Sequence, residues 1–494
     1  MNKLLNSIEK KNNRSVTTVN GAISNASTLS ECVDFFARGG ALRGATIEDR
    51  QNSFSRAFSE NKAYALRIAL YLRDIRGGQG ERQTFRDILI YLANNQEDVC
   101  NKLIPYVSEF GRVDDLYSFK DTDCWGVALA YIVRQLEQDW QNYNAQKPIS
   151  LFPKWAASTN TSSPKTVAIG FEIAKEWNLT PKQYRQRLSA MRKYLDVVER
   201  KISANEWSNI DYSKIPSNAS LLYRKAFSRH DGERYTEFLK KVEKGEVKIN
   251  AATLYPYDIV KKVRVEGDKT ANALWNNLPN YFNDGQNHNG LVVCDVSGSM
   301  MSGMGSVAPI DVSISLAIYF AERNNGDFKN YFITYSAKPK LIKLVGNNIS
   351  EKYRNLTNDS GNFGYHTNIQ AVFDLILSRA EKDKIAQEDM PETIYIVSDC
   401  EFDHPQNGSK TNFQIIKKKY KKSGYKMPQL VFWNVNAQNK QFPATINDDG
   451  VCLVSGCSPS ILGSVLGSDE INPVKIMEKT ILKEKYDVVE QILS

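Results

Sequence analysis

The stretch that decides the fold is GLVVCDVSGSM, residues 290–300, an apolar run followed at once by acidic and hydroxyl residues. Gly290–Cys294 predicts a short buried β-strand, and the loop after it carries Asp295, Ser297 and Ser299. In an open α/β sheet, ligands bind beyond the carboxyl ends of the strands. Alternating positions of an extended loop point to one side, so these oxygens would converge. One carboxylate and two hydroxyls suit a hard cation such as Mg²⁺ or Ca²⁺ and not zinc.

Two later segments place further oxygen ligands at the same edge of the predicted sheet. Thr367 directly precedes a predicted helix, and Asp399 ends a second buried strand, Thr393–Ser398. We therefore expect one divalent-cation site, with Mg²⁺ the first choice and Ca²⁺ or Mn²⁺ as alternatives. Its predicted ligands are Asp295, Ser297, Ser299, Thr367 and Asp399. The alternative is a Ser/Gly-rich loop in which both aspartates are helix caps or turn residues.

Strand-like and helix-like segments alternate through the C-terminal part, residues 286–494. This alternation predicts an open, doubly wound parallel sheet with helices on both faces. The predicted strands are Gly290–Cys294, Tyr331–Ser336 paired with Lys338–Leu344, Thr393–Ser398, Gln429–Trp433 and Val451–Ser455. The predicted helices are Pro309–Arg323, Thr367–Ala380, Asn412–Ser423, Pro459–Leu466 and one long helix over Pro473–Leu493.

The part that precedes this sheet is predicted to be helical. Residues 1–30 are polar and rich in Asn, Ser and Thr, which predicts a flexible arm. Residues 31–285 show recurring amphipathic stretches with short breaks, which favours a HEAT-like α-solenoid or ring, although no clean repeat is visible. The predicted helices are Lys62–Arg73, Glu81–Leu92, Asp123–Gln141, Ser163–Trp177, Pro181–Ile202, Ser220–Phe227 and Arg234–Lys244.

Composition narrows the class of protein further. The seven cysteines form no Cys-x-x-Cys pair and the chain has only four histidines, so a structural zinc site is not expected. We expect the cysteines to be small core residues. No apolar run approaches the ~20 residues of a membrane helix, and the first residues lack the apolar core of a signal peptide. We therefore expect a monomeric cytoplasmic protein without a membrane partner.

The net charge of +8 is unevenly placed along the chain. Residues 1–290 hold 42 Lys and Arg against 33 Asp and Glu, whereas residues 291–494 hold 22 against 23. A clustered basic excess attracts a polyanion, RNA above all, and its alternative is a solvated helical surface. The candidate RNA-contacting residues are Arg73, Arg76, Arg82, Arg185, Arg187, Arg192, Lys261, Lys262 and Arg264.

The first three of these arginines surround a turn with Gly77, Gly78 and Gly80. The functional interpretation is phosphate contact near a helix N-terminus. The alternative is an αα-hairpin with internal ion pairs. The pairs considered are Arg73 or Arg76 with Asp74, Glu81 or Asp87.

The sequence offers little support for catalysis. There is no phosphate-binding Gly-x-x-x-x-Gly-Lys-Ser/Thr loop, and position 297 is Ser where a phosphotransferase of the Asp-x-Asp-x-Thr type would have Asp. His366 and His404 lie near the predicted site in sequence and could be a general base or a zinc ligand. Two loop histidines are the better interpretation, and we expect no enzymatic activity.

Asp295–Met300, Thr367 and Ser398-Asp399 resemble the metal-ion-dependent adhesion site of von Willebrand A domains. The resemblance implies that Ser297, Ser299 and Thr367 coordinate the ion, while Asp295 and Asp399 often act through water. It also implies an open coordination position for an acidic group of a partner.

With this domain behind it, the helical part resembles the TROVE module of the Ro autoantigen family, and more closely the Ro-like proteins of plants, giant viruses and phages. The matching stretches are Leu72–Phe85, Leu103–Leu116, Pro153–Trp155, Ile215–Ser217 and Leu254–Pro256. This implies a HEAT-like ring with a basic surface that binds small structured RNAs outside and single-stranded RNA ends within.

Three functions remain open at this level. The leading hypothesis is a non-enzymatic protein that binds small non-coding or misfolded RNA on a basic helical ring and a cation in its C-terminal domain. The second is a protein-interaction scaffold whose cation captures an acidic partner residue. The third is a metal-dependent hydrolase of nucleic acid, against which stands the absence of clustered carboxylates of the two-metal type.

Overall fold

The apolar runs that follow residue 289 pair into a six-stranded sheet in the computed structural model of the chain. The described residues are 15–263, 268–282, 288–301, 307–335, 338–358, 367–403, 411–437, 440–466, 468 and 471–494. The strands are β3 (Gly290–Cys294), β4 (Tyr331–Thr334), β5 (Lys340–Lys343), β6 (Thr393–Ser398), β7 (Gln429–Asn434) and β8 (Val451–Ser455). Their order is β5-β4-β3-β6-β7-β8, and all neighbours are parallel except β4 and β5.

The order of the strands reverses between β3 and β6. Counted along the chain, the sheet reads 3-2-1-4-5-6, so the second half winds away from the first. The register pairs Cys294 of β3 with Val397 of β6, so the two strands end side by side. Ligands of open α/β sheets bind at such a reversal. The topology therefore places Asp295 and Asp399 together at the position where this kind of sheet binds its ligands.

Helices cover both faces of the sheet, as predicted. One face packs Val292 and Val397 against α17 (Pro309–Arg323) and α18 (Ile349–Asn358). The other packs Val293 and Ile396 against α19 (Ile369–Asp383) and α20 (Asn412–Ser423). Alternate strand residues thus enter two different cores, which is why the strands are apolar at consecutive positions.

The preceding region is mostly helical, which confirms the predicted pattern of amphipathic stretches. Its first group of helices is α2 (Glu31–Gly39), α3 (Ile47–Glu60), α4 (Lys62–Arg73), α5 (Arg82–Asn95), α6 (Glu97–Leu103), α7 (Val107–Phe110), α8 (Trp125–Asn144), α9 (Phe152–Trp155), α10 (Pro164–Glu176) and α11 (Pro181–Tyr194). Its second group is α12 (Val198–Ser203), α13 (Ser217–His230), α14 (Gly232–Glu243), α15 (Pro256–Val263) and α16 (Lys269–Asn276).

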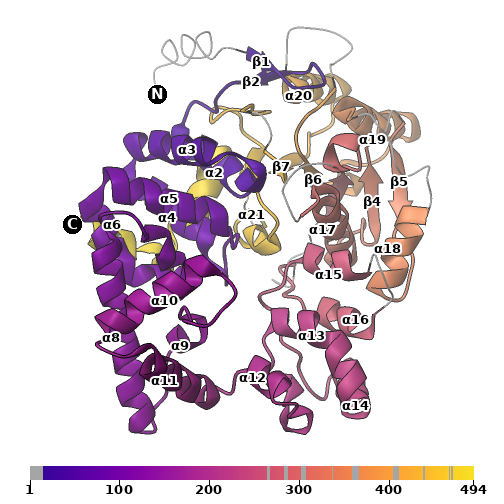
Figure 1. Cartoon of the computed structure of the whole chain (residues 1–494). Helices are drawn as coiled ribbons and strands as arrows, with labels where there is room; N and C mark the ends of the chain where they lie inside the picture. The colour runs from indigo at the N-terminus through magenta and orange to yellow at the C-terminus, as the bar shows by residue number, and fades with distance from the viewer. Residues whose placement is uncertain are drawn as a thin grey trace.

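In Figure 1 the first group of helices lies to the left of the sheet and the second group lies below it. The first group contacts the sheet domain where α2 packs against β8, and the second where α15 packs against α17 and α18. The chain passes from one group to the other through α11 and α12, far from the sheet (Figure 1). The described elements therefore follow a closed circuit in which the sheet joins the two helical groups.

The end of the chain returns to the first helices. After α21 (Leu462–Val465), the predicted single helix over Pro473–Leu493 is instead two, α22 (Pro473–Ile481) and α23 (Val488–Leu493). That prediction was wrong because the intervening turn directs Lys485 and the Tyr486 hydroxyl onto the buried Asp74 carboxylate. Both helices pack on α4, and α23 also packs on α6. The last helices of the predicted 286–494 domain are thus packed into the helical region.

The predicted loose arm is wrong for its described part. Residues 15–25 form a hairpin of β1 (Ser15–Thr17) and β2 (Ile23–Asn25). The hairpin bridges to the sheet domain at Gly21 with Asp403 and at Asn25 with Phe442. Residues 1–14 lie outside the described residues. Residues 15–25 are therefore attached to the sheet domain, whereas the sequence predicted a flexible arm.

Two further expectations concern side chains and membranes. All seven cysteines are buried and unpaired, as expected of small core residues. Within the described ranges, no helix combines the length and the apolar character needed to cross a bilayer.

Candidate metal centre

Asp295 is the innermost residue of the candidate site. It follows β3 directly and its side chain is fully buried. One carboxylate oxygen, Oδ1, accepts a hydrogen bond from the Ser297 backbone N–H at 2.9 Å. The other, Oδ2, accepts from the Ser398 hydroxyl at 2.5 Å. Burial raises the pKa of Asp295, because a charge without water around it is costly.

Asp399 faces Asp295 from the end of the neighbouring strand. It is 2% exposed, and its Oδ1 accepts a hydrogen bond from the Glu401 backbone N–H at 3.1 Å. Its Oδ2 is buried and has no hydrogen-bond partner among the described residues. Burial, together with the nearby Asp295 charge, raises the pKa of Asp399 to about 7. Two buried carboxylates therefore lie close together, and no group in the described ranges compensates one of their oxygens for its lost hydration.

Hydroxyl groups complete the oxygen-rich cluster. The Ser297 and Ser299 hydroxyls lie 3.1 Å apart, and Ser299 also hydrogen-bonds the Asp399 carboxylate. The Thr367 hydroxyl donates to the Glu401 carbonyl at 2.7 Å. The structure thus brings the two serines into direct contact with the aspartates. Thr367 is linked to this cluster through its hydrogen bond to Glu401, two residues after Asp399.

The segment after Asp399 carries two acidic residues that the sequence analysis passed over. Glu401 is 3% exposed, and Asp403 Oδ1 lies 3.2 Å from the Thr367 hydroxyl. Both lie at alternate positions after Asp399, the same spacing that singled out Ser297 and Ser299 after Asp295. Their negative charges raise the pKa of the central aspartates, Glu401 acting on Asp399 and Asp403 on Asp295.

Backbone strain accompanies this segment. Cys400 has a φ of 62°, in the left-handed region that disfavours residues other than glycine, and its side chain is buried. It lies between Asp399 and Glu401, so the turn sets the directions in which their side chains leave the strand. Strain of this kind persists only where the surroundings enforce it, and it clusters at functional sites.

The β1–β2 hairpin covers the edge of the site, which sequence reasoning could not have found. The Asn20 carboxamide donates to the Thr367 hydroxyl at 3.0 Å and to the Glu401 carbonyl at 2.7 Å. The Val19 backbone N–H donates to Glu401 Oε2 at 2.7 Å, and the Thr18 hydroxyl donates to the Phe402 carbonyl at 2.6 Å. The partners are more than 340 residues apart in the chain, so no local pattern connects them.

The donor set fits a hard cation better than a transition metal. It consists of carboxylate and hydroxyl oxygens, the ligands that Mg²⁺ and Ca²⁺ prefer. In the part of the chain that the structure describes, no group of three or more His, Cys, Asp or Glu residues is placed to hold a metal. Hydroxyls and water would therefore have to supply much of the coordination. His366 and His404 lie outside the described residues.

Two of the predicted RNA contacts are internal structural residues. Arg73 is 1% exposed, and its Nη2 lies 2.7 Å from Asp115 Oδ2. Arg192 is half-buried, and its guanidinium donates to the Pro153 and Ala156 carbonyls, at 2.8 Å each, and to the Ser158 hydroxyl. Their prediction as RNA contacts was wrong, because the donors that would bind phosphate are used inside the protein.

Around the glycine turn, the structure agrees better with the αα-hairpin interpretation than with phosphate contact. The ion pairs, however, join different residues from those considered in the sequence. Arg73 and Arg86 share Asp115, while Glu81 pairs with Arg43, Asp87 with Arg50 and Asp74 with Lys485. These pairs join helices that follow one another in space rather than neighbours in the chain. Buried acidic residues of this helical group therefore bind arginines and a lysine of other segments and help to hold it together.

The remaining candidates are more accessible. Arg76, Arg82, Arg185 and Lys261 are exposed, and Lys262 is half-buried. Arg187 is half-buried, with its guanidinium 5.0 Å from the Trp140 ring centre and 4.9 Å from that of Trp177. Arg264 lies outside the described residues. The structure thus spreads these side chains over several helices, and those that remain exposed stay predictions as RNA contacts.

Comparisons with known proteins return domains without an established function. Residues 289–491 match a domain of unknown function, DUF7788, and residues 18–97 and 174–278 match another, DUF2828. An uncharacterized protein of Acanthamoeba polyphaga mimivirus is 29% identical over 93% of this chain and 86% of its own length. Among solved structures, the Ro (RSR) protein of Deinococcus radiodurans aligns with a TM-score of 0.36 and 12% identity over 92% of this chain and 99% of its own.

Proposed function

We propose that the carboxyl edge of the sheet binds a divalent cation and through it an acidic group of a ligand. The observation that supports this most is Asp399 Oδ2, a buried carboxylate oxygen without a partner among the described residues. Such an oxygen costs free energy unless a cation or a proton compensates it. The adjacent Asp295 carboxylate makes a cation the more effective partner, because it neutralises both charges at once.

The proposed chemistry is binding and not turnover. Two carboxylates and up to three hydroxyls leave positions in the coordination shell of Mg²⁺ or Ca²⁺ for water or for an oxygen of a partner. An acidic side chain of a second protein is the ligand of matching chemistry. The resemblance of Asp295–Met300, Thr367 and Ser398-Asp399 to a metal-ion-dependent adhesion site supports the same interpretation. The protein would then act as a cation-dependent interaction module.

Isothermal titration calorimetry of chelator-treated protein with Mg²⁺, Ca²⁺ and Mn²⁺ tests this proposal. One ion should bind per chain, and Asp295→Ala should abolish the binding heat. Asp389→Ala is the matched control, because Asp389 is an exposed carboxylate of the same domain and should leave the titration unchanged. Equal titrations of the wild type and Asp295→Ala would refute the proposed site.

RNA binding by the helical region is the second candidate. It is favoured by the basic excess of residues 1–290 and by the exposure of Arg82 and Arg185 on α5 and α11. A gel-shift series with structured and single-stranded RNA at rising salt tests it, since phosphate contacts lose affinity steeply with salt. Arg82→Glu with Arg185→Glu should weaken binding, whereas Glu176→Gln on α10 should not. Absence of binding even at low salt would count against this candidate.

A further inference from the structure

The C-terminal domain has almost no net charge, but its charges are strongly separated along the chain. Residues 404–447 contain eight lysines and not one Asp or Glu. The rest of residues 291–494 holds 14 Lys and Arg against 23 Asp and Glu. The near-zero balance of the whole domain therefore hides one strongly basic segment, whose centre is α20.

Helix α20 turns its lysines away from the core. Its buried side, with Phe413, Ile416 and Tyr420, packs into the core beneath the sheet. Spacing of one helical turn aligns Lys417 with Lys421 and Lys418 with Lys422 in two adjacent columns. All four are exposed, as is Lys426 beyond the helix end. We call these five lysines, Lys417, Lys418, Lys421, Lys422 and Lys426, the lysine face.

The lysine face carries positive charge that no acidic residue in the described part of the chain pairs with. Among the described residues, Lys419 of the same helix pairs with Asp374 at 2.6 Å, whereas no ion pair is formed by any member of the lysine face. Like charges on adjacent helical turns repel each other and slightly destabilise a helix. The Lys417 ammonium lies 5.7 Å from the Phe413 ring centre, and Lys421 and Lys422 lie in the last helical turn, where the helix dipole favours cations. An anionic ligand would further reduce the repulsion among these lysines.

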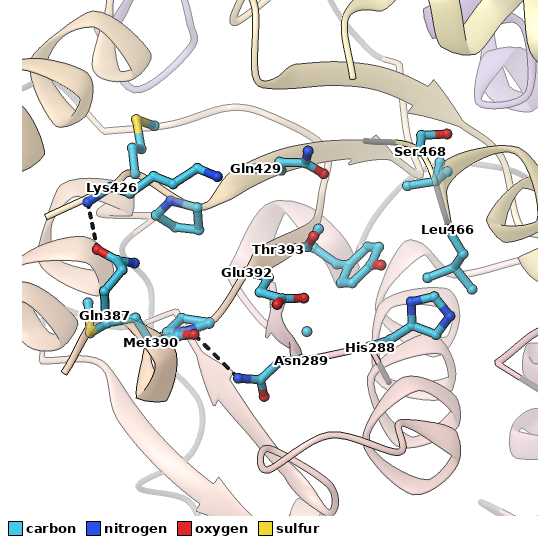
Figure 2. A pocket seen from close by; sticks show the side chains of 16 residues that line it. His288, Asn289, Gln387, Met390, Glu392, Thr393, Lys426, Gln429, Leu466 and Ser468 are labelled. Carbon is cyan, nitrogen blue, oxygen red and sulfur yellow. Dashed lines mark hydrogen bonds between the residues drawn. The ribbon is translucent and has the colours of Figure 1, made fainter. Parts of the chain in front are cut away.

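A groove adjoins the lysine face at the amino edge of the sheet, opposite the candidate metal centre. It encloses about 350 Å³ and lies where β3, β6 and β7 begin. Lys426 lines its rim and so belongs to both features. Figure 2 shows polar side chains gathered around it, among them His288, Gln387, Glu392 and Gln429. The Lys426 backbone N–H donates to Gln387 Oε1 at 2.7 Å, which fixes this rim.

The chemistry of the two features differs and is complementary. Lysine ammonium groups are strongly hydrated point charges that suit phosphate oxygens without reading sequence. The groove offers amide groups, an imidazole ring and the Glu392 carboxylate, which can hydrogen-bond or stack on the edges and faces of an unpaired base. Its volume lies at the lower end of small-ligand sites, which fits one base and excludes a duplex. The apolar side of α20 is buried, so it cannot insert into a lipid surface.

We infer that the lysine face and the groove form a binding site for single-stranded nucleic acid. The phosphates run along Lys417, Lys418, Lys421 and Lys422, and one base enters the groove beside Lys426. The Glu392 carboxylate accepts a hydrogen bond from an exocyclic amino group, which favours cytosine over uracil. The site does not depend on the proposed cation centre, which lies at the other end of the strands.

Fluorescence anisotropy with labelled oligocytidine and oligouridine, as RNA and as DNA, and with a duplex of equal length tests the inference. Single strands should bind, and affinity should fall steeply from about 50 to 200 mM salt. Changing Lys417, Lys418, Lys421 and Lys422 to Gln should lower the logarithmic salt slope by about three, at ~0.7 per lost phosphate contact on a single strand. The matched control changes Lys240, Lys241, Lys244 and Lys248 to Gln, four exposed lysines near α14 that are interspersed with acidic residues.

A second variant tests the groove separately. Glu392→Gln should lower the preference for oligocytidine over oligouridine by roughly tenfold, in line with the ~1–3 kcal/mol of a good base contact, and should leave the salt slope unchanged. EDTA should change none of these results, which separates them from failure of the cation site. RNA and DNA strands report whether the 2′-hydroxyl contributes.

Several outcomes would overturn the inference. They are no binding of any single strand at low salt, equal affinity for the duplex, or equal loss in the α14 control. Loss of binding in Arg82→Glu with Arg185→Glu and retention in the lysine-face variant would move the nucleic-acid site to the helical region. Binding of phosphatidylserine vesicles without binding of oligonucleotides would replace nucleic acid by a membrane surface.

Discussion

The two edges of the six-stranded sheet differ in the sign and in the burial of their charged residues. At the carboxyl edge, Asp295, Asp399 and Glu401 are buried together, and the pKa of Asp399 is raised to about 7. At the amino edge, the lysine face is exposed and a polar groove opens beside it. A buried charge costs free energy unless a specific partner compensates it, whereas exposed charges are screened by water and salt. The carboxyl edge should therefore bind few ligands with large effects on stability, and the amino edge many anions with small effects.

The largest expected difference between the edges is in cation binding. Asp399→Asn should weaken Mg²⁺ binding at least ~100-fold, comparable to the loss of a buried charged ligand. At a concentration of about 100 times the wild-type Kd, Mg²⁺ should stabilise the wild type by ~2.7 kcal/mol and this variant by at most ~0.4 kcal/mol. Glu392→Gln at the amino edge is the matched control, and thermal unfolding with and without Mg²⁺ measures all three. If Mg²⁺ stabilised Asp399→Asn and Glu392→Gln to a similar extent, cation binding could not be assigned to the carboxyl edge.

The pH dependence of stability should reveal the buried carboxylates without any cation. Because the pKa of Asp399 is raised from 3.8 to about 7, the folded protein holds a proton there that the unfolded chain has lost. The free energy of unfolding should therefore fall as pH rises from about 4 to 7, by roughly 2–4 kcal/mol from this group. In chelator, Asp399→Asn should lack this decrease and be more stable than the wild type at about pH 8. Parallel curves of unfolding free energy against pH for the two proteins would contradict the proposed burial cost.

Loss of the Asn20 hydrogen bonds should destabilise the β1–β2 hairpin at the carboxyl edge without destabilising the rest of the sheet domain. Asn20→Ala removes two hydrogen bonds to Thr367 and Glu401 and should cost about 1 kcal/mol or somewhat more. Amide hydrogen exchange should become faster at residues 18–22 and stay unchanged in α20. Val19→Ala is the neighbouring control, because the Val19 side chain is 73% exposed and the backbone bond to Glu401 would remain. Faster exchange throughout the sheet domain would mean that the hairpin supports the whole domain.

The smallest change in the free energy of unfolding is expected for substitutions in the lysine face, beside the amino edge. Changing Lys417, Lys418, Lys421 and Lys422 to Gln should raise stability by only a few tenths of a kcal/mol at low salt. The gain should vanish at about 0.5 M salt, where exposed charges are screened. Urea unfolding at the two salt concentrations measures it. A large effect that persists in salt would show that these lysines are structural.

Most elements of the fold could be predicted from local patterns because local physics decides them. The predicted bounds agree with the structure for α4, α17, β6 and α20. Asn61 and Thr411 cap two of these helices through side-chain hydrogen bonds, and Pro309 begins a third. The residues that start these helices lie within one turn of the helix start, so they can be recognised from the local sequence.

The candidate site was predictable in its centre and not at its border. Asp295 and Asp399 follow apolar strands, and strand ends converge by a general rule of α/β sheets. Glu401 could have been included by the same alternation that selected Ser299. Asn20 could not, because its hydrogen-bond partners Thr367 and Glu401 are more than 340 residues away in the chain. Arg73 was misassigned for the same reason, since its partner Asp115 lies 42 residues away.

Titration with Mn²⁺ followed by electron paramagnetic resonance counts the ions bound at the carboxyl edge without relying on a ligand or an activity. One Mn²⁺ should bind per chain and be displaced by Mg²⁺. Asp399→Asn should bind none, and Glu392→Gln should bind Mn²⁺ as the wild type does. Equal Mn²⁺ binding by the wild type and Asp399→Asn would contradict it.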